Sequence, residues 1–381
     1  MQWSILITGG RVIDTFSGID EVKDVAISGK TIEEIGTNLP KENADVHIDA
    51  QGKIVTPGLV DLHVHNYISR GNQPSVDSDT TNLAFGVTTA LDAGTATPGE
   101  YPHYWESDIQ NTKVRLYSLV RMPDPYGPTP SSIGEVQELI TSYDTLLGVK
   151  FHHSQKFSSL PLAREAADFG GGILMCEAYG APIPQLLDWM NPGDILTHTF
   201  HAAFRFPIFD HRGQLWSKIW DAKERGVYLD IGHGARGFAF RTLEQAVAQG
   251  FKPDTISTDV HVGNIDGPVF DMPTTMSKMF TVGLSLNEII DMSTRIPARA
   301  LDQERELGSI AVGTVADVVI SSIDQGEYTY MDVLHETRTA KEKINPETVI
   351  YSGNIYDGDK YEPVEMTHKH DAPPGFILTE T

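Results

Sequence analysis

The feature that most constrains the fold is a series of eight short apolar runs in the middle of the chain, most of which turn polar or glycine-rich at their ends. Stretches with helical patterns separate most of them. Buried parallel strands look like this when their C-terminal ends carry chemistry. Eight such units predict a (β/α)8 TIM barrel, of class α/β. The predicted strands are 58–65, 87–93, 113–121, 147–152, 172–178, 194–201, 227–233 and 255–261.

Both ends of the chain predict a second, smaller unit. Residues 4–55 alternate short β-rich runs with turns, and the pattern returns at 317–322 and 348–354. Neither end is long enough to make a good sandwich alone. We therefore expect residues 1–56 and 306–381 to form one composite β-sandwich that flanks a barrel of residues 57–305. The polar segment 322–346 gives no clear pattern, and residues 366–381 are expected to be a loosely held tail.

Composition limits what the protein binds and where it works. The 381 residues include 29 basic and 52 acidic side chains, and the net charge of -23 argues against nucleic acid or an anionic membrane as a partner. No apolar run approaches the roughly 20 residues needed to cross a bilayer, and residues 1–20 lack a signal pattern. The single cysteine, Cys176, rules out an internal disulfide. We expect a cytoplasmic protein with a small-molecule substrate, and a homo-oligomer.

Two histidines at the end of the first predicted barrel strand indicate a metal site. His63 and His65 are two residues apart, so both side chains point to the same side of a strand. Neutral imidazole suits zinc, and mixed nitrogen and oxygen ligands also admit manganese, iron or cobalt.

Lys150 ends the fourth predicted strand within an apolar run, where a buried ammonium is costly. An ammonium there would also repel a metal held by His63 and His65. Carbamylation by CO2 converts the lysine into an anionic carboxylate on a long arm, which can bridge two cations. The sequence therefore suggests a two-metal hydrolase.

Five motifs follow one another along the chain: Thr56-Pro-Gly-Leu-Val-Asp-Leu-His-Val-His, Gly148-Val-Lys150, Thr197-His198, Asp230-Ile-Gly-His233-Gly and Ser257-Thr-Asp259. This ordered set resembles the amidohydrolase superfamily, and within it the dihydroorotase-like and deacetylase-like metal-dependent hydrolases. The likeness covers nearly the whole chain. It implies two divalent metal ions, with Zn2+ the first candidate, that share a hydroxide and are bridged by carbamylated Lys150.

The resemblance also implies the roles of individual residues. Asp259 would bind the first metal, orient the hydroxide and shuttle its proton to the leaving group. His233, which lies between two glycines, would hydrogen-bond to the substrate or to the oxyanion. His201 is expected to be a pocket or outer-sphere residue. The implied metal ligands are His63, His65, Lys150, Glu177, His198 and Asp259.

The fifth predicted strand departs from the family pattern. Many relatives have a metal-binding histidine there, whereas this chain has Cys176 and Glu177. Setting the following Ala181 and Pro182 against the proline of relatives puts Glu177 at the histidine position. A carboxylate can bind the second metal, and Cys176 is the alternative ligand.

A glycine pattern in the seventh unit offers a different interpretation. Residues 232–237 match Gly-X-Gly-X-X-Gly, which occurs in dinucleotide-binding folds. Here the pattern follows the seventh strand of a series instead of opening a βαβ nucleotide fold, so it does not favour a nucleotide site.

The implied reaction is hydrolysis of an amide or ester bond in a small acyl compound, lactone or cyclic amide. Deacetylase-like relatives make an acyclic acyl compound with a carboxylate the first candidate. An arginine among Arg70, Arg121, Arg205 and Arg236 would bind that carboxylate, and the substrate-binding candidates are His201, Arg236 and Arg70.

Two alternatives remain open. One is a deaminase of the same superfamily, which usually works with one metal and lacks the bridging lysine. The other is a non-catalytic assembly protein of the dihydropyrimidinase-like type, in which the metal ligands are degraded. Metal content separates the three classes, since they would contain two, one and no equivalents.

Overall fold

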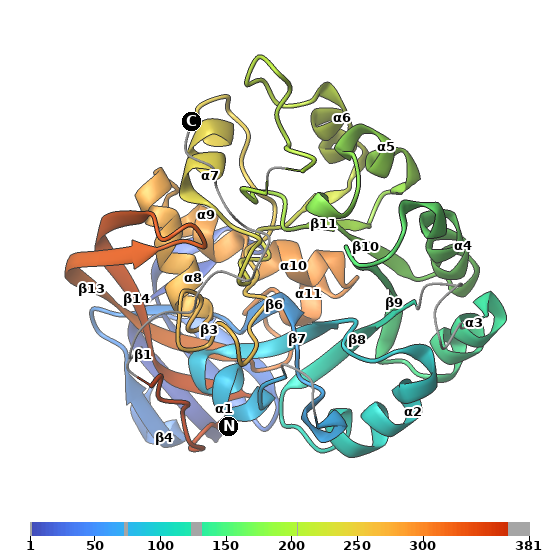
Figure 1. The fold of residues 1–381 in the computed structure, drawn as a ribbon. Helices are drawn as coiled ribbons and strands as arrows, with labels where there is room; N and C mark the ends of the chain where they lie inside the picture. Colours follow the sequence, from blue (N-terminus) through green and yellow to red (C-terminus); the bar gives the residue numbers. More distant parts are fainter. Residues whose placement is uncertain (1, 72–74, 123–131, 204, 365–381) are drawn as a thin grey trace.

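The barrel is built from parallel strands in sequential order, seen at the centre of Figure 1. The computed structural model describes residues 2–71, 75–122, 132–203 and 205–364. Seven strands pair side by side from β6 to β12. They are β6 (Leu59–Val64), β7 (Val87–Ala93), β8 (Arg115–Arg121), β9 (Leu146–Phe151), β10 (Ile173–Glu177), β11 (Ile195–Thr197) and β12 (Tyr228–Leu229).

The eighth predicted strand closes the ring through two backbone bridges. Thr255 pairs in parallel with Asp230, and Val260 pairs in parallel with Val64 of β6. The first and last strands are therefore neighbours, as a closed barrel requires. The predicted (β/α)8 architecture is confirmed.

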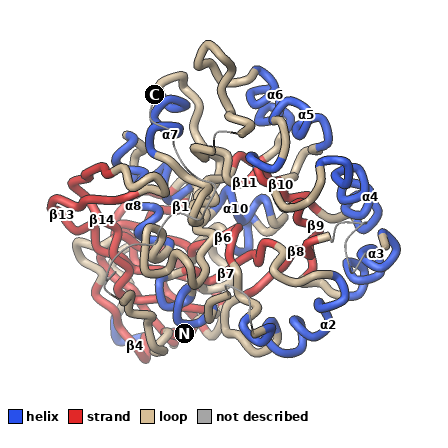
Figure 2. The backbone as a smooth tube through the Cα atoms, in the orientation of Figure 1, coloured by secondary structure: helices blue, strands red, loops and turns tan. Residues whose placement is uncertain are grey.

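Helices lie around the outside of the barrel strands, shown in blue in Figure 2. α10 contacts the first barrel strand, β6. α8 packs against β14, which belongs to the second sheet. The helices are α1 (Ser78–Thr81), α2 (Tyr101–Tyr104), α3 (Ile133–Ser142), α4 (Leu160–Gly170), α5 (Ile183–Leu186), α6 (Ser217–Arg225), α7 (Phe240–Val247), α8 (Met272–Lys278), α9 (Leu286–Asp291), α10 (Arg295–Ala300) and α11 (Glu304–Leu307).

The barrel strands are buried on both faces, which explains their near-continuous apolar runs. Leu91, Leu119, Met175 and Ile195 come from four different strands and share one apolar cluster. Alternate positions on the same strands, such as Cys176, belong to a larger cluster that also contains the buried apolar residues of α4.

The two ends of the chain were predicted to form one composite β-sandwich, and in the structure they come together in one separate eight-stranded sheet. Its strand order is β15-β14-β13-β5-β1-β2-β3, with β4 paired to β1. The ends meet where β13 runs antiparallel to β5. The strands are β1 (Trp3–Asp14), β2 (Ile19–Ser28), β3 (Thr31–Gly36), β4 (Ala44–Asp49), β5 (Ile54–Pro57), β13 (Val318–Met331), β14 (Thr337–Tyr351) and β15 (Asn354–Ile355).

The polar segment 322–346, which had no clear sequence pattern, lies in the long β13–β14 hairpin. The boundaries predicted near residues 56 and 306 stay a prediction. The expected tail, 366–381, lies outside the described residues.

Candidate metal centre

The six predicted metal ligands come together at the C-terminal ends of the barrel strands, the end at which TIM barrels carry their active sites. His63 lies in β6, Lys150 in β9 and Glu177 at the end of β10, while His198 directly follows β11. The side chains of these four residues are buried, and Lys150 is only 1% exposed. Their roles as ligands stay predictions, but their positions agree with the sequence analysis.

The first group of candidate ligands is His63, His65 and Asp259. Oδ1 of Asp259 lies 3.4 Å from Nε2 of His63 and 3.0 Å from Nε2 of His65. This oxygen is buried and accepts no well-aligned hydrogen bond from the described residues. A buried carboxylate oxygen next to two imidazole nitrogens is a donor set that fits a divalent metal ion.

The orientation of the histidine rings supports this interpretation. Nδ1 of His63 lies 2.8 Å from the hydroxyl of Thr197, and Nδ1 of His65 lies 2.6 Å from the hydroxyl of Thr95. Nδ1 of His198 lies 2.5 Å from the carbonyl oxygen of Gly232. Metal-binding histidines usually have the second ring nitrogen fixed in this way. All three Nε2 atoms consequently point toward the acidic groups.

Glu177 is the centre of a second group. Its Oε1 lies 3.6 Å from Nζ of Lys150 and 3.8 Å from Nε2 of both His152 and His198. Its Oε2 accepts hydrogen bonds from the amide of His153 at 2.8 Å and from Nδ1 of the same residue at 2.6 Å. Glu177, His152 and His153 together form a second cluster that could hold a metal.

Cys176, the alternative ligand on the fifth strand, points the other way. Successive side chains of a strand point to opposite faces, and the Cys176 side chain packs with the outer apolar cluster. Burial raises the pKa of its thiol well above the ordinary value. The structure therefore places Glu177, and not Cys176, beside Lys150.

Lys150 lies between the two groups. Its Nζ is 3.3 Å from Nε2 of His63 and 3.6 Å from Oε1 of Glu177. Gly94 makes room for the lysine stem, because a Cβ atom at this position would lie 2.6 Å from Cβ of Lys150. A group at the end of the lysine arm can consequently reach both groups.

The site keeps its carboxylates ionised. Burial alone would raise the pKa of Asp259, but the charge of His63, the 3.0 Å contact with His65 and the charge of His198 bring it well below its usual range. For Glu177, burial is likewise outweighed by Lys150 and the neighbouring histidines, so the pKa of this carboxyl is also lowered. Negative carboxylates in a buried pocket favour cations.

The glycine pattern at 232–237 wraps around the candidate ligands. A Cβ atom on Gly234 would lie 2.1 Å from Oδ2 of Asp259, and one on Gly237 would lie 2.1 Å from Nδ1 of His198. Gly234 also has a φ of +52°, which favours glycine. The pattern therefore reflects close packing against His198 and Asp259.

His233 is fully buried, and both of its ring nitrogens have partners. Nδ1 lies 2.9 Å from the carbonyl oxygen of Gly234, and Nε2 lies 2.6 Å from Nζ of Lys278. Lys278 also donates to the carbonyl oxygens of Pro268 and Met331. The predicted contact of His233 with substrate stays a prediction, and it would require the pair with Lys278 to open.

The substrate-binding candidates occupy different environments. Arg70 forms an ion pair with Glu100 at 2.7 Å and donates to the carbonyl oxygen of Thr95. Arg236 is half-buried, and its charge acts on the hydroxyl of Tyr179 and on His261. Nε2 of His201 is buried and has no hydrogen-bond partner among the described residues. The contact of Arg70, Arg236 and His201 with a substrate stays a prediction.

Three residues near the candidate ligands escaped the sequence analysis. Tyr179 stacks on His198 with ring centres 5.2 Å apart, and its ring edge contacts His201. His152 and His153 follow Lys150 directly. His152 lies two positions after Lys150, but β9 ends at Phe151, so strand alternation gives no reliable signal for its side chain.

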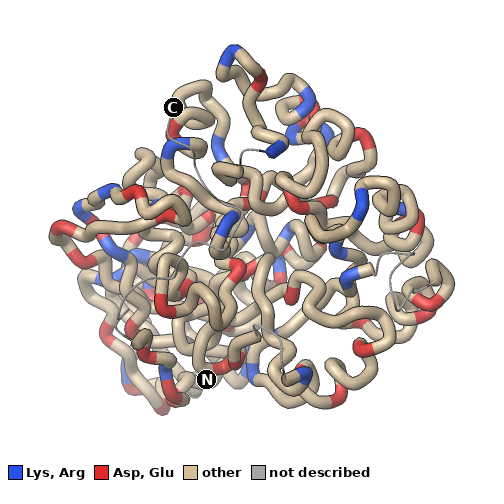
Figure 3. Tube along the Cα trace, viewed as in Figure 1, with Lys and Arg blue, Asp and Glu red and all other residues tan. Residues whose placement is uncertain are grey.

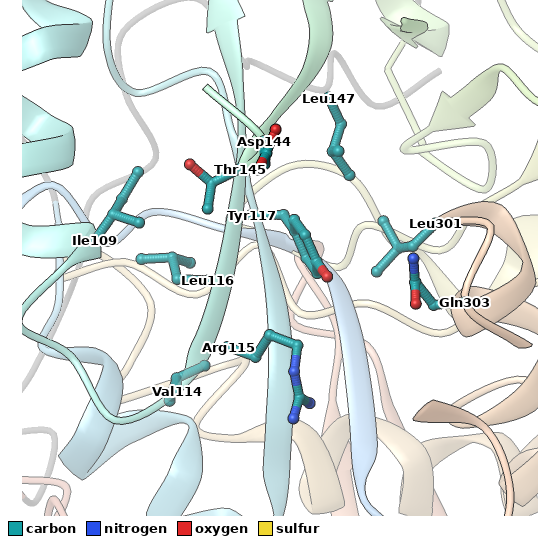
Figure 4. A pocket seen from close by; sticks show the side chains of 10 residues that line it. All are labelled: Ile109, Val114, Arg115, Leu116, Tyr117, Asp144, Thr145, Leu147, Leu301 and Gln303. Atoms are coloured by element: carbon teal, nitrogen blue, oxygen red, sulfur yellow. The ribbon is translucent and has the colours of Figure 1, made fainter. Parts of the chain in front are cut away.

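A cavity of about 490 Å³ lies elsewhere, near the N-terminal ends of β8 and β9. Its lining includes Arg115, Tyr117 and Leu301 (Figure 4). Arg115 already pairs with buried Asp317 at 2.7 Å. The N-terminal face of a TIM barrel usually serves stability, so we assign the chemistry to the opposite end.

Charged residues are spread over both parts of the molecule, and acidic positions lie among basic ones along the trace in Figure 3. In the described parts of the chain, none of the helices combines the length and the apolar character needed to cross a membrane. The expected cellular location, partners and oligomeric state stay predictions.

Comparisons with known proteins agree with the geometry. The model of the Amidohydrolase family matches residues 239–356. A deacetylase of Enterococcus faecalis is 29% identical over 94% of this chain and its own full length. A solved structure described as an adenine deaminase is also 29% identical, with a TM-score of 0.85 over 94% of this chain and all of that chain. A solved dihydroorotase, 24% identical over 94% of this chain and all of that one, shares the fold with a TM-score of 0.82.

Proposed function

Because this chain belongs to the amidohydrolase superfamily and is a metal-dependent hydrolase of amide bonds, we propose that it cleaves an acyl group from a small molecule that carries a carboxylate. The bond is an acyclic amide or ester, with lactones and cyclic amides as the neighbouring classes. The relative from Enterococcus faecalis, which matches along its whole length, is named a deacetylase.

The observation that carries the two-metal form of this proposal is the position of Lys150. Its Nζ lies between His63 of the first group and Glu177 of the second. A carbamate on this arm would give both groups an oxygen ligand and would remove a buried positive charge from the centre of the site. We propose zinc as the metal and carbamylated Lys150 as its bridge.

Bound divalent metals supply Lewis acidity and a water of lowered pKa. The residues of the chain then divide the remaining work. Asp259, with its lowered pKa, is ionised and able to accept a proton from the attacking water. The same carboxyl group then protonates the leaving nitrogen or oxygen.

Arg236 is the proposed partner of the substrate carboxylate. It follows the seventh strand unit, and its charge acts on Tyr179, which stacks on His198, and on His261, whose ring contacts that of His65.

Deamination is the second candidate function. The solved structure described as an adenine deaminase covers 94% of this chain, which favours it. Lys150 beside two ligand groups argues against a one-metal deaminase. A non-catalytic assembly protein is disfavoured because the candidate ligands are all present and close together.

The test is a substrate panel combined with metal analysis. Zinc-loaded protein is incubated with N-acyl amino acids, acyl hydroxy acids, lactones, cyclic amides and adenine, and both released acid and ammonia are measured. We expect two metal equivalents, one added CO2 by gentle intact-mass analysis, and acid release from an acyl compound. Ammonia release from adenine, with one metal equivalent, would replace this proposal with the deaminase.

A further inference from the structure

The fifth strand leaves the second metal short of one nitrogen ligand. Glu177 stands where many relatives have a histidine, and His198 is the only histidine among the predicted ligands of the second metal. A further imidazole should therefore lie within reach of Glu177. Two histidines that the sequence did not predict as ligands lie within reach of Glu177: His152 and His153.

His152 has the geometry of a ligand. Its Nε2 lies 3.8 Å from Oε1 of Glu177, the same distance as Nε2 of His198 from that oxygen. A separation of 3.8 Å is too long for a hydrogen bond. It suits two atoms that bind one metal ion, because ligand atoms about 2.0–2.2 Å from zinc lie roughly 3–4 Å from each other.

The other ring nitrogen of His152 is held by Ser154. The serine hydroxyl lies 2.7 Å from Nδ1 and its amide nitrogen lies 3.1 Å away. When Nε2 binds a metal, Nδ1 carries the proton and donates a hydrogen bond to the serine hydroxyl, as Nδ1 of His63 does to Thr197. The amide of Ser154 must then turn away from the ring.

His153 has a different geometry. Its Nδ1 and its amide both contact Oε2 of Glu177, at 2.6 and 2.8 Å. Both are hydrogen-bond distances. These bonds fix the rotation of the carboxylate, and they leave Oε1 directed at Lys150, His152 and His198.

We propose that Nε2 of His152 is a ligand of the second metal, in the place of the missing fifth-strand histidine, and that His153 positions Glu177. The inference rests on the proposed two-metal function. It adds a ligand from the segment after β9, so that Lys150 and His152 both come from the fourth strand unit.

The experiment compares metal binding in the full-length wild type with that of His152→Ala, His153→Ala and the control His211→Ala. His211 is exposed in the segment before α6, and its charge acts on Asp210. Zinc affinity is measured by chelator competition, and the visible spectrum is recorded for cobalt-loaded protein. Thermal melting shows that each variant is folded.

We expect His152→Ala to keep the first metal at wild-type affinity and to bind the second at least 100-fold more weakly. The cobalt spectrum should change, and added imidazole should restore part of both signals by filling the vacated position. His153→Ala should weaken the second metal by roughly tenfold, because the amide of His153 still holds Glu177, and imidazole should not rescue it.

Two tight metal equivalents and an unchanged cobalt spectrum in folded His152→Ala would overturn the inference and leave the two-metal function intact. If His152→Ala does not fold, His152→Asn takes its place in the same measurements. A single metal equivalent in the wild type would instead refute the two-metal function, and this inference with it.

Discussion

Thr197 offers a sharp test of how the first metal group is organised. Its hydroxyl accepts from Nδ1 of His63 at 2.8 Å and donates to Oδ2 of Asp230 at 2.8 Å. Thr197→Val keeps the shape of the side chain and removes both hydrogen bonds. The His63 ring then loses the contact that fixes its tautomer and its orientation.

The expected effect on metal affinity follows from this geometry. Losing such a partner typically lowers metal affinity 10–100-fold, or about 1.4–2.7 kcal/mol. Stability should also fall by about 1–3 kcal/mol, because a buried ring nitrogen is left unpaired. Asp230 keeps the hydroxyls of Thr255 at 2.7 Å and Ser257 at 2.6 Å, so its own position should change little.

Thr255→Val is the matched control. It also removes a hydroxyl from Asp230, but it touches none of the candidate ligands. Zinc affinity by chelator competition and melting of the metal-free protein should separate the two variants. Both should be less stable, and only Thr197→Val should bind the first metal more weakly. Equal metal affinities in the two variants would refute the reasoning.

Three further predictions concern the proton shuttle, the glycine segment and a buried lysine. Asp259→Asn keeps a carbonyl oxygen but cannot accept a proton, so turnover should fall roughly 100-fold or more in metal-replete protein, and near-normal turnover would move the shuttle elsewhere. Gly234→Ala places a Cβ 2.1 Å from Oδ2 of Asp259 and should displace the first metal. In the control Gly250→Ala, Gly250 also has a positive φ but its Cβ would lie in open space, so the change should cost only about 1–2 kcal/mol of stability. Equal metal content in the two variants, by elemental analysis, would contradict this prediction. Burial lowers the pKa of Lys278 from 10.5 to about 7, so between these values the unfolded chain binds more protons and stability rises with pH. Lys278→Met should flatten that rise in denaturant unfolding between about pH 7 and pH 10, and parallel curves would show that Lys278 is not responsible.

The sequence predicted the barrel well because buried parallel strands carry an apolar pattern that few other structures share. It overestimated the sixth and seventh strands, predicted at 194–201 and 227–233, whose ladders end at Thr197 and Leu229. His198 has a φ of +55°, so the backbone turns away from the ladder at the residue that enters the site. The β13–β14 hairpin was missed because much of it is exposed and its pairing is interrupted by register shifts.

The candidate ligands were found through motifs, while their partners were not. Thr95 and Thr197 contact His65 and His63 across 30 and 134 positions of sequence, and nothing local to a threonine indicates such a contact. The choice between Cys176 and Glu177 needed the register of β10, because a shift of one residue turns each side chain of a strand to the opposite face. His152 was overlooked because it lies just beyond the end of β9, where strand alternation no longer applies reliably.

The closure of the barrel has a consequence for its mechanics. The first and eighth strands share one backbone bridge, Val64 to Val260, and the amide of Asp259 donates to the carbonyl oxygen of His63. The carboxylate of Asp61 also accepts hydrogen bonds from the amide and the hydroxyl of Thr258. The first metal group draws ligands from both strand units: His63 and His65 come from the first, and Asp259 comes from the eighth. A cation bound there would join segments separated by nearly two hundred residues of chain. The ion would hold the first and eighth strands together. We therefore expect the contacts between these two strands to open more readily when the ion is lost.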